Sequence, residues 1–206
     1  MGATQATDTP DRTVPTPSPR WVRPAGGPPA PAALPVTLEE IERARETLRG
    51  IAELSPLQHS RALSRAAGTD VHLKCENLQR AGSFKVRGAY VRMAQLSEEE
   101  RGRGVVAASA GNHAQGVALA AAKLGIRARI FMPHGVALPK LQATRDHGAE
   151  VVLHGSTVDE SLAEAQRWAT ETGAVFIPPF DDPAVIAGQG TCLLYTSDAA
   201  DEGLGV

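Results

Sequence analysis

The sequence predicts an α/β fold built from parallel twisted sheets with helices packed on them. Four short apolar strands are expected, at residues 105–108, 127–132, 150–153 and 174–177. Segments of helical length separate these strands, and they end at Gly125, Gly148 and Gly173, as helices commonly do. Strands that alternate with helices of this length favour a parallel sheet with right-handed crossovers.

The first 36 residues differ in composition from the rest of the chain. They hold nine prolines among many Ala, Thr and Gly residues. Such a segment buries too little apolar surface to offset its chain entropy, so we expect a disordered tail over residues 1–36. The tail has no apolar run like that of a signal peptide, and export is therefore not expected.

The chain that follows this tail should begin with a helix. Thr37-Leu38-Glu39-Glu40 is a capping box, which marks a helix N-terminus. Apolar residues at helical spacing follow it, and the pattern ends near Gly50. Further along, Ser55-Pro56-Leu57 is typical of an extended turn. Val71-His72-Leu73-Lys74 alternates like a strand.

Lys85 is the first candidate for chemistry. Ser83 is a favourable helix N-cap, and apolar residues at helical spacing continue from Val86 to Leu96. Lys85 would then lie in the first turn, where the positive end of the helix dipole disfavours an ammonium. A neutral amine is the nucleophile that an aldehyde cofactor needs. A lone lysine is more often a solvated surface residue, so the neighbouring motifs must decide.

A second candidate is the turn Ser109–His113. It follows the apolar strand Val105–Ala108 and precedes an alanine-rich helix. A strand, a tight turn at Gly111 and a helix N-terminus form an anion site from backbone N–H groups, to which Ser109 and Asn112 add side-chain donors. The alternative is a plain strand-to-helix cap, which is the commoner use of Ser and Asn at such positions.

Charge and motif content argue against several other classes. The net charge of −2 gives no reason to expect nucleic acid or an anionic membrane as a partner. No apolar run approaches the ~20 residues that span a bilayer. The six histidines lack zinc-type spacing with Cys or carboxylates, so no metal site is expected. Residues 102–107 match a dinucleotide fingerprint only superficially, because the glycines precede the strand.

Taken together, several motifs resemble the tryptophan-synthase-β-like, fold type II enzymes that use pyridoxal 5'-phosphate, and within them the threonine dehydratases. The similarity runs from about Thr37 to Thr191. The motifs that carry it are Lys74-x-Glu76-x-x-Gln79, Ser83-Phe84-Lys85-x-Arg87-Gly88-Ala89, Ser109-Ala110-Gly111-Asn112-His113-Ala114-Gln115-Gly116, Pro178-Pro179-Phe180-Asp181-Asp182 and Ile186-Ala187-Gly188-Gln189-Gly190-Thr191.

The resemblance implies a role for each motif residue. Lys85 would bind the cofactor covalently and later move the α-proton of the substrate, and Phe84 would pack beside the cofactor ring. Asn112 would hydrogen-bond the phenolic oxygen of the cofactor. The substrate carboxylate would be bound by Ser109, Ala110, Gly111, Asn112 and His113. The implied reaction is β-elimination, in which L-threonine, and L-serine with it, yields a 2-oxo acid and ammonia.

Alternatives stay open at this point. Serine racemases of this fold carry a second serine immediately before the motif glycine, where this chain has Ala110, whose methyl carries no proton. Other enzymes of the same cofactor class could act on serine, on hydroxyaspartate or by β-replacement. A non-catalytic fragment is a third interpretation.

The resemblance also implies a domain organisation. Residues 37–76 would begin a larger domain, residues 77–176 would form a smaller movable domain, and residues 177–191 would return to the larger one, which is incomplete here. Members of the family are expected to be homo-oligomers. If residues 192–206 are excluded, Cys75 is the one remaining cysteine and cannot form an internal disulfide. A chain without disulfides fits the reducing cytosol, so we expect a cytoplasmic protein.

The last 15 residues do not resemble the family. Back-translation of Cys192–Glu202 gives DNA that resembles a transposase adapter used in library preparation. We therefore expect residues 192–206 to be adapter read-through. Resequencing the source DNA tests this, because a native reading frame that continues into the same residues would contradict it.

Overall fold

The computed structural model of the chain describes residues 36–201, with side chains for residues 36–194. The tail expected at residues 1–36 therefore lies outside the described residues, apart from Val36. The described residues belong to one compact unit. No helix in the described part is long and apolar enough to cross a membrane.

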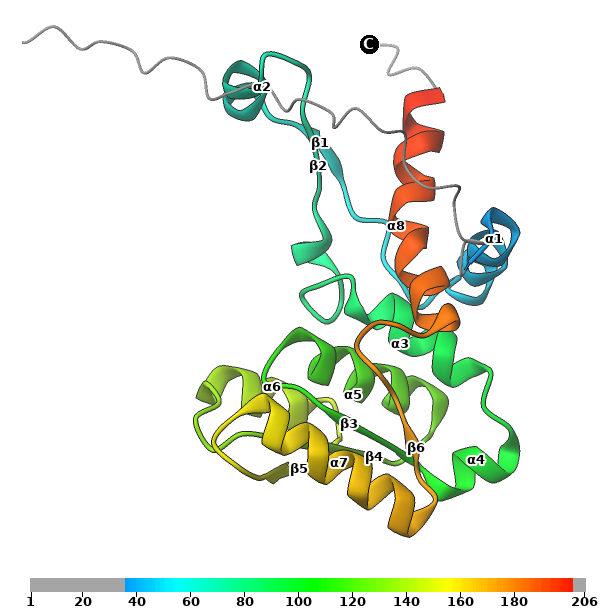
Figure 1. The fold of residues 1–206 in the computed structure, drawn as a ribbon. Coiled ribbons are helices and arrows are strands. Elements are labelled where there is room, and N and C mark those ends of the chain that lie inside the picture. The colour runs from blue at the N-terminus through cyan, green and yellow to red at the C-terminus, as the bar shows by residue number, and fades with distance from the viewer. Residues whose placement is uncertain (1–35, 202–206) are drawn as a thin grey trace, which may run out of the picture. The chain divides into compact units, whose positions relative to one another are not determined.

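Helices and short strands alternate along the described chain (Figure 1). In order they are α1 (Leu38–Thr47), β1 (Leu57–His59), α2 (Arg61–Ala67), β2 (His72–Lys74), the 3₁₀ turn η1 (Glu76–Leu78), α3 (Lys85–Ala94), α4 (Glu98–Arg103), β3 (Val105–Ala108), α5 (Asn112–Leu124), β4 (Ala128–Met132), α6 (Leu138–Asp146), β5 (Glu150–Leu153), α7 (Val158–Thr172), β6 (Val175–Phe176) and α8 (Pro183–Asp201).

Four of the strands form one parallel sheet in the order β5-β4-β3-β6. These are the four strands that the sequence predicts, and the parallel α/β architecture is confirmed. Val105 pairs with Ala128 on one side and with Val175 on the other, so β3 is an interior strand. All four residues of β3 are buried, as expected for a strand covered on both faces.

Helices cover both faces of this sheet. Val105 and Ala107 of β3 face a core that includes residues of α3, α5 and α6, while Val106 and Ala108 face a core that includes Ala165 of α7. This alternation follows from the two-residue period of a strand. The turn that leads from β3 into α5 therefore lies at the carboxyl end of the sheet, where open α/β sheets commonly bind ligands.

A second apolar cluster joins α1, α3 and α8. Ala44, Leu48, Val91 and Ala187 are its buried members from these three helices. The capping box predicted at the start of α1 is present, because the Thr37 side chain accepts from the Glu40 backbone N–H and the Glu40 side chain accepts from that of Thr37. The cluster packs the helix that carries Lys85 against the helix that carries the Gly188–Thr191 motif.

The antiparallel pair of β1 and β2 is a feature that the sequence only half predicts. The strand at 71–74 is confirmed as β2, whereas β1 falls where an extended turn was expected to end. The helix α2, capped by Ser60, was not predicted. The strand β1 has Leu57 as its one apolar residue, so it shows no alternation like that of Val71–Lys74, and α2 is a seven-residue helix with no buried residue.

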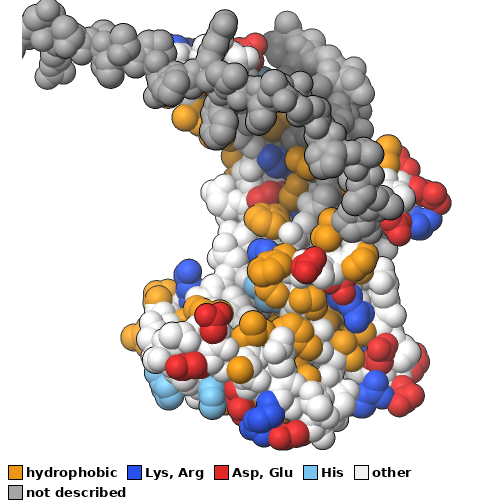
Figure 2. All heavy atoms as spheres, in the orientation of Figure 1, with side chains coloured by type: hydrophobic (Ala, Val, Ile, Leu, Met, Phe, Trp, Pro, Cys, Tyr) orange, Lys and Arg blue, Asp and Glu red, His pale blue; other side chains and the backbone are white. Residues whose placement is uncertain are grey.

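Charges of both signs lie intermingled on the face shown in Figure 2. Lys and Arg side chains alternate there with Asp and Glu, and no large area of one sign is visible on that face. This distribution agrees with the small net charge of −2. An electrostatic surface for nucleic acid would instead need clustered basic residues.

Candidate active site

Lys85 is the first residue of α3, as the sequence predicts, but the N-cap is Phe84 and not Ser83. Phe84 already has helical backbone angles, and its side chain makes no capping hydrogen bond. The Ser83 hydroxyl instead accepts from the backbone N–H of Lys85 at 3.4 Å, only two residues on. A short Ser side chain commonly makes such a local turn in place of a helix cap.

The amine of Lys85 is partly withdrawn from water. Its Nζ donates to the backbone carbonyl of Pro179 at 2.8 Å and lies 5.2 Å from the ring centroid of Phe84. Burial lowers the pKa of Lys85, which is the direction expected from the sequence. The physical cause is burial, whereas the sequence argument relied on the helix dipole.

The turn between β3 and α5 has the geometry of an anion site. Gly111 is the N-cap of α5 and has no side chain to occupy the N–H groups of the first helical turn. Ser109 Oγ accepts from the Gly111 N–H at 3.1 Å, which leaves its own hydroxyl proton available to donate. The side chain of Asn112 is exposed at the start of the helix. The capping role of Ser109 and the anion-binding role of the turn are thus compatible.

Lys140 adds a positive charge at this turn, which the sequence does not reveal. A Cβ placed on Gly111 would lie 3.4 Å from Lys140 Nζ. Lys140 belongs to α6, which is 29 residues further along the chain. A cation at this place favours a bound anion such as a carboxylate.

Close packing of α5 on α3 brings the turn and Lys85 together. A Cβ on Gly116 would lie 2.9 Å from the carbonyl carbon of Lys85 and 3.1 Å from Lys85 Cβ. Such distances leave no room for a side chain at Gly116. The glycine that ends the Ser109–Gly116 motif therefore has a specific function, which is to let α5 approach the lysine.

His113 has a structural role through its side chain. The ring is buried, and Nε2 lies 2.9 Å from the backbone carbonyl oxygen of Ile177, to which it donates as the neutral tautomer. Burial is the main cause that lowers the pKa of His113 to about 4; the hydrogen bond to Ile177 opposes this shift, and the charge of Lys85 adds to it. His113 is therefore neutral at physiological pH. Only its backbone N–H belongs to the candidate anion site.

The carbonyl of Pro179 is a site feature that sequence reasoning missed. It accepts from Lys85 Nζ and also from Gln189 Nε2 of α8, at 3.2 Å. The sequence did contain a signal, because Pro178–Asp182 and Gly188–Thr191 are both part of the resemblance. Any residue type can provide a backbone carbonyl acceptor, however, so the motifs did not reveal this hydrogen bond.

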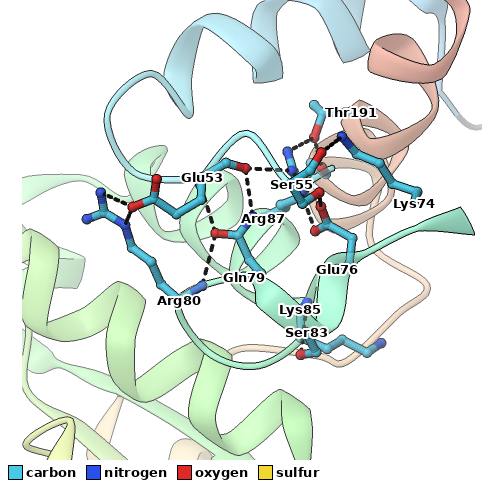
Figure 3. A network of polar contacts seen from close by, with 11 residues as sticks. Glu53, Ser55, Lys74, Glu76, Gln79, Arg80, Ser83, Lys85, Arg87 and Thr191 are labelled. Atoms are coloured by element: carbon cyan, nitrogen blue, oxygen red, sulfur yellow. Dashed lines mark hydrogen bonds and ion pairs between the residues drawn. The ribbon is translucent and has the colours of Figure 1, made fainter. Parts of the chain in front are cut away.

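Behind Lys85, the side chain of Arg87 lies in a buried polar cluster (Figure 3). Its Nε and Nη2 bind the two carboxylate oxygens of Glu76 at 2.8 and 2.9 Å. Nη1 donates to Thr191 Oγ1 at 3.2 Å, and Nη2 also donates to the Glu53 carbonyl at 3.4 Å. Arg87 thereby connects the first turn of α3 to η1, to α8 and to the segment that follows α1.

Glu76 is ionised in this cluster. Burial raises its pKa, but hydrogen bonds from Arg87 and from the Ser55 hydroxyl outweigh burial and leave the pKa below its ordinary value. Gln79, also buried, donates to the backbone carbonyl of Glu53 at 3.0 Å and accepts from its N–H at 2.8 Å. The motif Lys74-x-Glu76-x-x-Gln79 thus supports α3 through Glu76, while Lys74 and Gln79 bind the backbone of the segment after α1. Within the described residues, no group of His, Cys, Asp and Glu could hold a metal ion.

Comparison with known proteins agrees with this geometry. Residues 49–204 match the family described as pyridoxal-phosphate dependent enzyme, so the match continues past Thr191, where the resemblance was expected to end. An L-threonine ammonia-lyase of Thermotoga maritima is 56% identical over 156 residues, which is 76% of this chain and 39% of that protein. A catabolic L-threonine dehydratase of Escherichia coli is 46% identical over 158 residues, 77% of this chain and 48% of that protein.

Solved structures show the same fold. A processed threonine deaminase from Solanum lycopersicum has a TM-score of 0.72 at 42% identity, over 79% of this chain and 46% of that one. A maize serine racemase has a TM-score of 0.77 at 32% identity, over 81% of this chain and 51% of that one. The expectation of a fold type II enzyme is confirmed.

The chain spans less than half the length of the two curated relatives described above. The family match nevertheless covers 156 residues and includes Lys85 and the turn at Gly111. The chain belongs to the family of pyridoxal-phosphate-dependent enzymes.

Proposed function

We propose that this chain carries the lysine and the carboxylate-binding turn of a threonine ammonia-lyase. The reaction is the β-elimination and deamination of L-threonine, and of L-serine, to 2-oxobutanoate or pyruvate and ammonia. The observation that carries the proposal is the partly buried amine of Lys85, with a lowered pKa, held by α3 against the α5 helix that begins at Gly111.

The residues around Lys85 fit the proposed cofactor. When bound, pyridoxal 5'-phosphate supplies an aldehyde for an amine and an electron sink for the substrate. Lys85 offers that amine, Phe84 places an aromatic ring beside it, and Asn112 presents an exposed amide at the start of α5. Gly116 keeps the space between α3 and α5 free of a side chain. We infer that these residues hold the cofactor.

The turn Ser109–His113 would bind the substrate carboxylate. The N–H groups of the first turn of α5, the Ser109 hydroxyl and the nearby Lys140 ammonium all favour an anion there. With its carboxylate fixed, the substrate presents its α-carbon to Lys85. The neutral amine can then take the α-proton, and the ammonium so formed can supply a proton where the β-hydroxyl leaves.

We propose that the larger assembly follows the family. The segments 37–76 and 177–191 would belong to a larger domain, and residues 77–176 to a smaller domain that closes over the substrate and excludes water. The apolar cluster formed by α1, α3 and α8 would then pack residues of the two domains against each other, with Val91 from the smaller domain and Ala44 and Ala187 from the larger one. A cytosolic homo-oligomer is the proposed form of the protein encoded by the complete gene.

The experiment that tests this function compares ammonia release from L-threonine, L-serine and hydroxyaspartate, using the protein encoded by the complete gene. We expect L-threonine to give the highest kcat/KM and L-serine to be turned over more slowly. A preference for hydroxyaspartate would favour the related dehydratase. No release from any of the three would leave a β-replacement enzyme or a non-catalytic protein.

Racemisation is tested in the same assay. Ala110 stands where serine racemases carry a serine, and a methyl group cannot donate a proton to the opposite face of the substrate. We expect L-serine to yield pyruvate and ammonia without D-serine. Accumulation of D-serine at a rate similar to that of ammonia would contradict the assignment as a lyase.

A further inference from the structure

The motif Gly188-Gln189-Gly190-Thr191 forms one turn of α8 that lies directly against α3. A Cβ on Gly188 would lie 2.6 Å from the carbonyl oxygen of Arg87 and 2.8 Å from Gly88 Cα. The two helices therefore touch backbone to backbone at Gly88 and Gly188. This contact begins at Arg87, two residues beyond Lys85, so it is close to the turn that carries the lysine.

Gln189 reaches the amine of Lys85 through a shared acceptor. Its Nε2 donates to the carbonyl oxygen of Pro179 at 3.2 Å, and Lys85 Nζ donates to the same oxygen at 2.8 Å. The stem of Gln189 crosses over Gly88, because a Cβ there would lie 3.0 Å from Gln189 Cγ. A carbonyl oxygen has two lone pairs, so it can accept from both donors at once.

Thr191 contacts the same helix turn through the side chain of Arg87. It is fully buried, its hydroxyl oxygen accepts from Arg87 Nη1 at 3.2 Å, and its proton goes to the carbonyl of Gly188 at 2.7 Å. Arg87 is two residues after Lys85 and is held by Glu76 as well. A single turn of α8 thus contacts the first turn of α3 twice, through Arg87 directly and through Lys85 by way of the Pro179 carbonyl.

We propose that Gln189 and Thr191 are positioning residues for Lys85. Gln189 fixes the Pro179 carbonyl that receives the amine, and Thr191 fixes Arg87 and with it the first turn of α3. This inference rests on the proposed role of Lys85, and it assigns the Gly188–Thr191 motif a function that the motif resemblance alone does not explain.

The physical effect is on the protonation of the amine. When Gln189 also donates to the Pro179 carbonyl, this oxygen stabilises the Lys85 ammonium less. When Thr191 holds Arg87, the first turn of α3 stays in place and the amine is kept away from water. His113 of α5 also faces this region and is neutral above about pH 4. Loss of either positioning contact should therefore raise the pKa of Lys85 and reduce the fraction of neutral amine at pH 7.

The test measures the amine without any cofactor. Peptide mass spectrometry measures the rate at which Lys85 is acylated in the 206-residue chain, at a series of pH values. Gln189→Met keeps the volume of the side chain and removes the donor, so we expect the midpoint of the pH profile to rise by about half a unit or more. Gln142→Met, at an exposed position of α6, is the matched control and should leave the midpoint unchanged.

Thr191 gives an independent pair of variants, which decides the matter if Gln189→Met does not fold. Thr191→Val removes the hydroxyl with little change of shape and should raise the Lys85 midpoint. Thr191→Ser keeps the hydroxyl and should restore the wild-type midpoint. Lower thermal stability without any change of midpoint, in either Gln189→Met or Thr191→Val, would show a merely structural contact and would overturn the proposal.

The two proposals can fail separately. If wild-type protein from the complete gene forms no covalent cofactor adduct on Lys85, the proposed function fails. The acylation profiles test only whether Gln189 and Thr191 act on the amine, and they give that answer whether or not the cofactor binds.

Discussion

At the scale of the residue, the site depends on how much water reaches the Lys85 amine. Its pKa is lowered by burial, and its Nζ contacts the Pro179 carbonyl oxygen and the aromatic ring of Phe84. No carboxylate is among them. The environment therefore favours the neutral, nucleophilic amine, as Schiff-base chemistry requires.

Arg87 is the residue whose loss should cost the most stability. Its guanidinium is 1% exposed and pairs with Glu76, so Arg87→Met leaves a carboxylate without its charge partner. We expect the free energy of unfolding to fall by about 3–5 kcal/mol in urea titrations. Glu39→Gln breaks the exposed pair with Arg43 on α1 and should change stability little. Equal effects of the two substitutions would contradict the importance of the buried pair.

His113 makes the fold sensitive to acid. Its pKa is about 4 in the folded chain and 6.5 ordinarily, so the unfolded chain takes up a proton first as the pH falls. Burial of the neutral ring therefore makes a contribution to the free energy of unfolding that is fully present above pH 6.5. As the pH falls from 6.5 to 4, about 3 kcal/mol of it is lost.

His113→Gln keeps a donor for the Ile177 carbonyl but does not titrate. Between pH 7 and 4 the wild type should therefore lose about 3 kcal/mol more stability than this variant in urea titrations. Parallel pH dependence of the two proteins would show that His113 does not titrate as a buried group.

At the scale of the element, the packing of α5 on α3 is the critical contact. Gly116→Ala places a methyl group 2.9 Å from the Lys85 carbonyl carbon, so α5 must shift. We expect the free energy of unfolding to fall by about 1–3 kcal/mol, and less of the protein to carry a covalent adduct of the cofactor on Lys85. Thermal unfolding and adduct absorbance measure the two effects.

Gly102 provides the matched control for this substitution. It lies in the helix α4, and a Cβ there would meet nothing within 4 Å. Gly102→Ala should be neutral or slightly stabilising, because alanine favours a helix. If Gly116→Ala behaved like Gly102→Ala, the close approach of α5 would not limit the position of the lysine.

The elements themselves could be predicted where the pattern is long or the cap is clear. The four strands of the parallel sheet, the capped helix α1 and the helical segment that ends at Gly173, which is α7, are confirmed with shifts of a few residues at their ends. Ser83 was wrong as an N-cap because its hydroxyl bonds locally to Lys85 N–H. The strand β1 was missed because it has one apolar residue, Leu57, and therefore no alternation of apolar and polar residues.

At the scale of the whole molecule, the sequence identifies the motifs of the candidate site, but it does not predict the contacts between them. The local sequence pattern and the family resemblance together identify Lys85 and Gly111 as candidate site residues. The contact of Arg87 with Thr191 spans 104 positions and that of Lys85 with Pro179 spans 94, and no local rule gives such pairs. They arise only when the sheet, α3 and α8 pack together.

The most direct measurement is borohydride trapping of pyridoxal 5'-phosphate on the protein encoded by the complete gene, followed by peptide mapping. The account predicts one reduced adduct, on Lys85, that disappears in Lys85→Arg and persists in Lys123→Arg, a substitution at an exposed position of α5. An adduct on another lysine, or no adduct on wild-type protein, would contradict it.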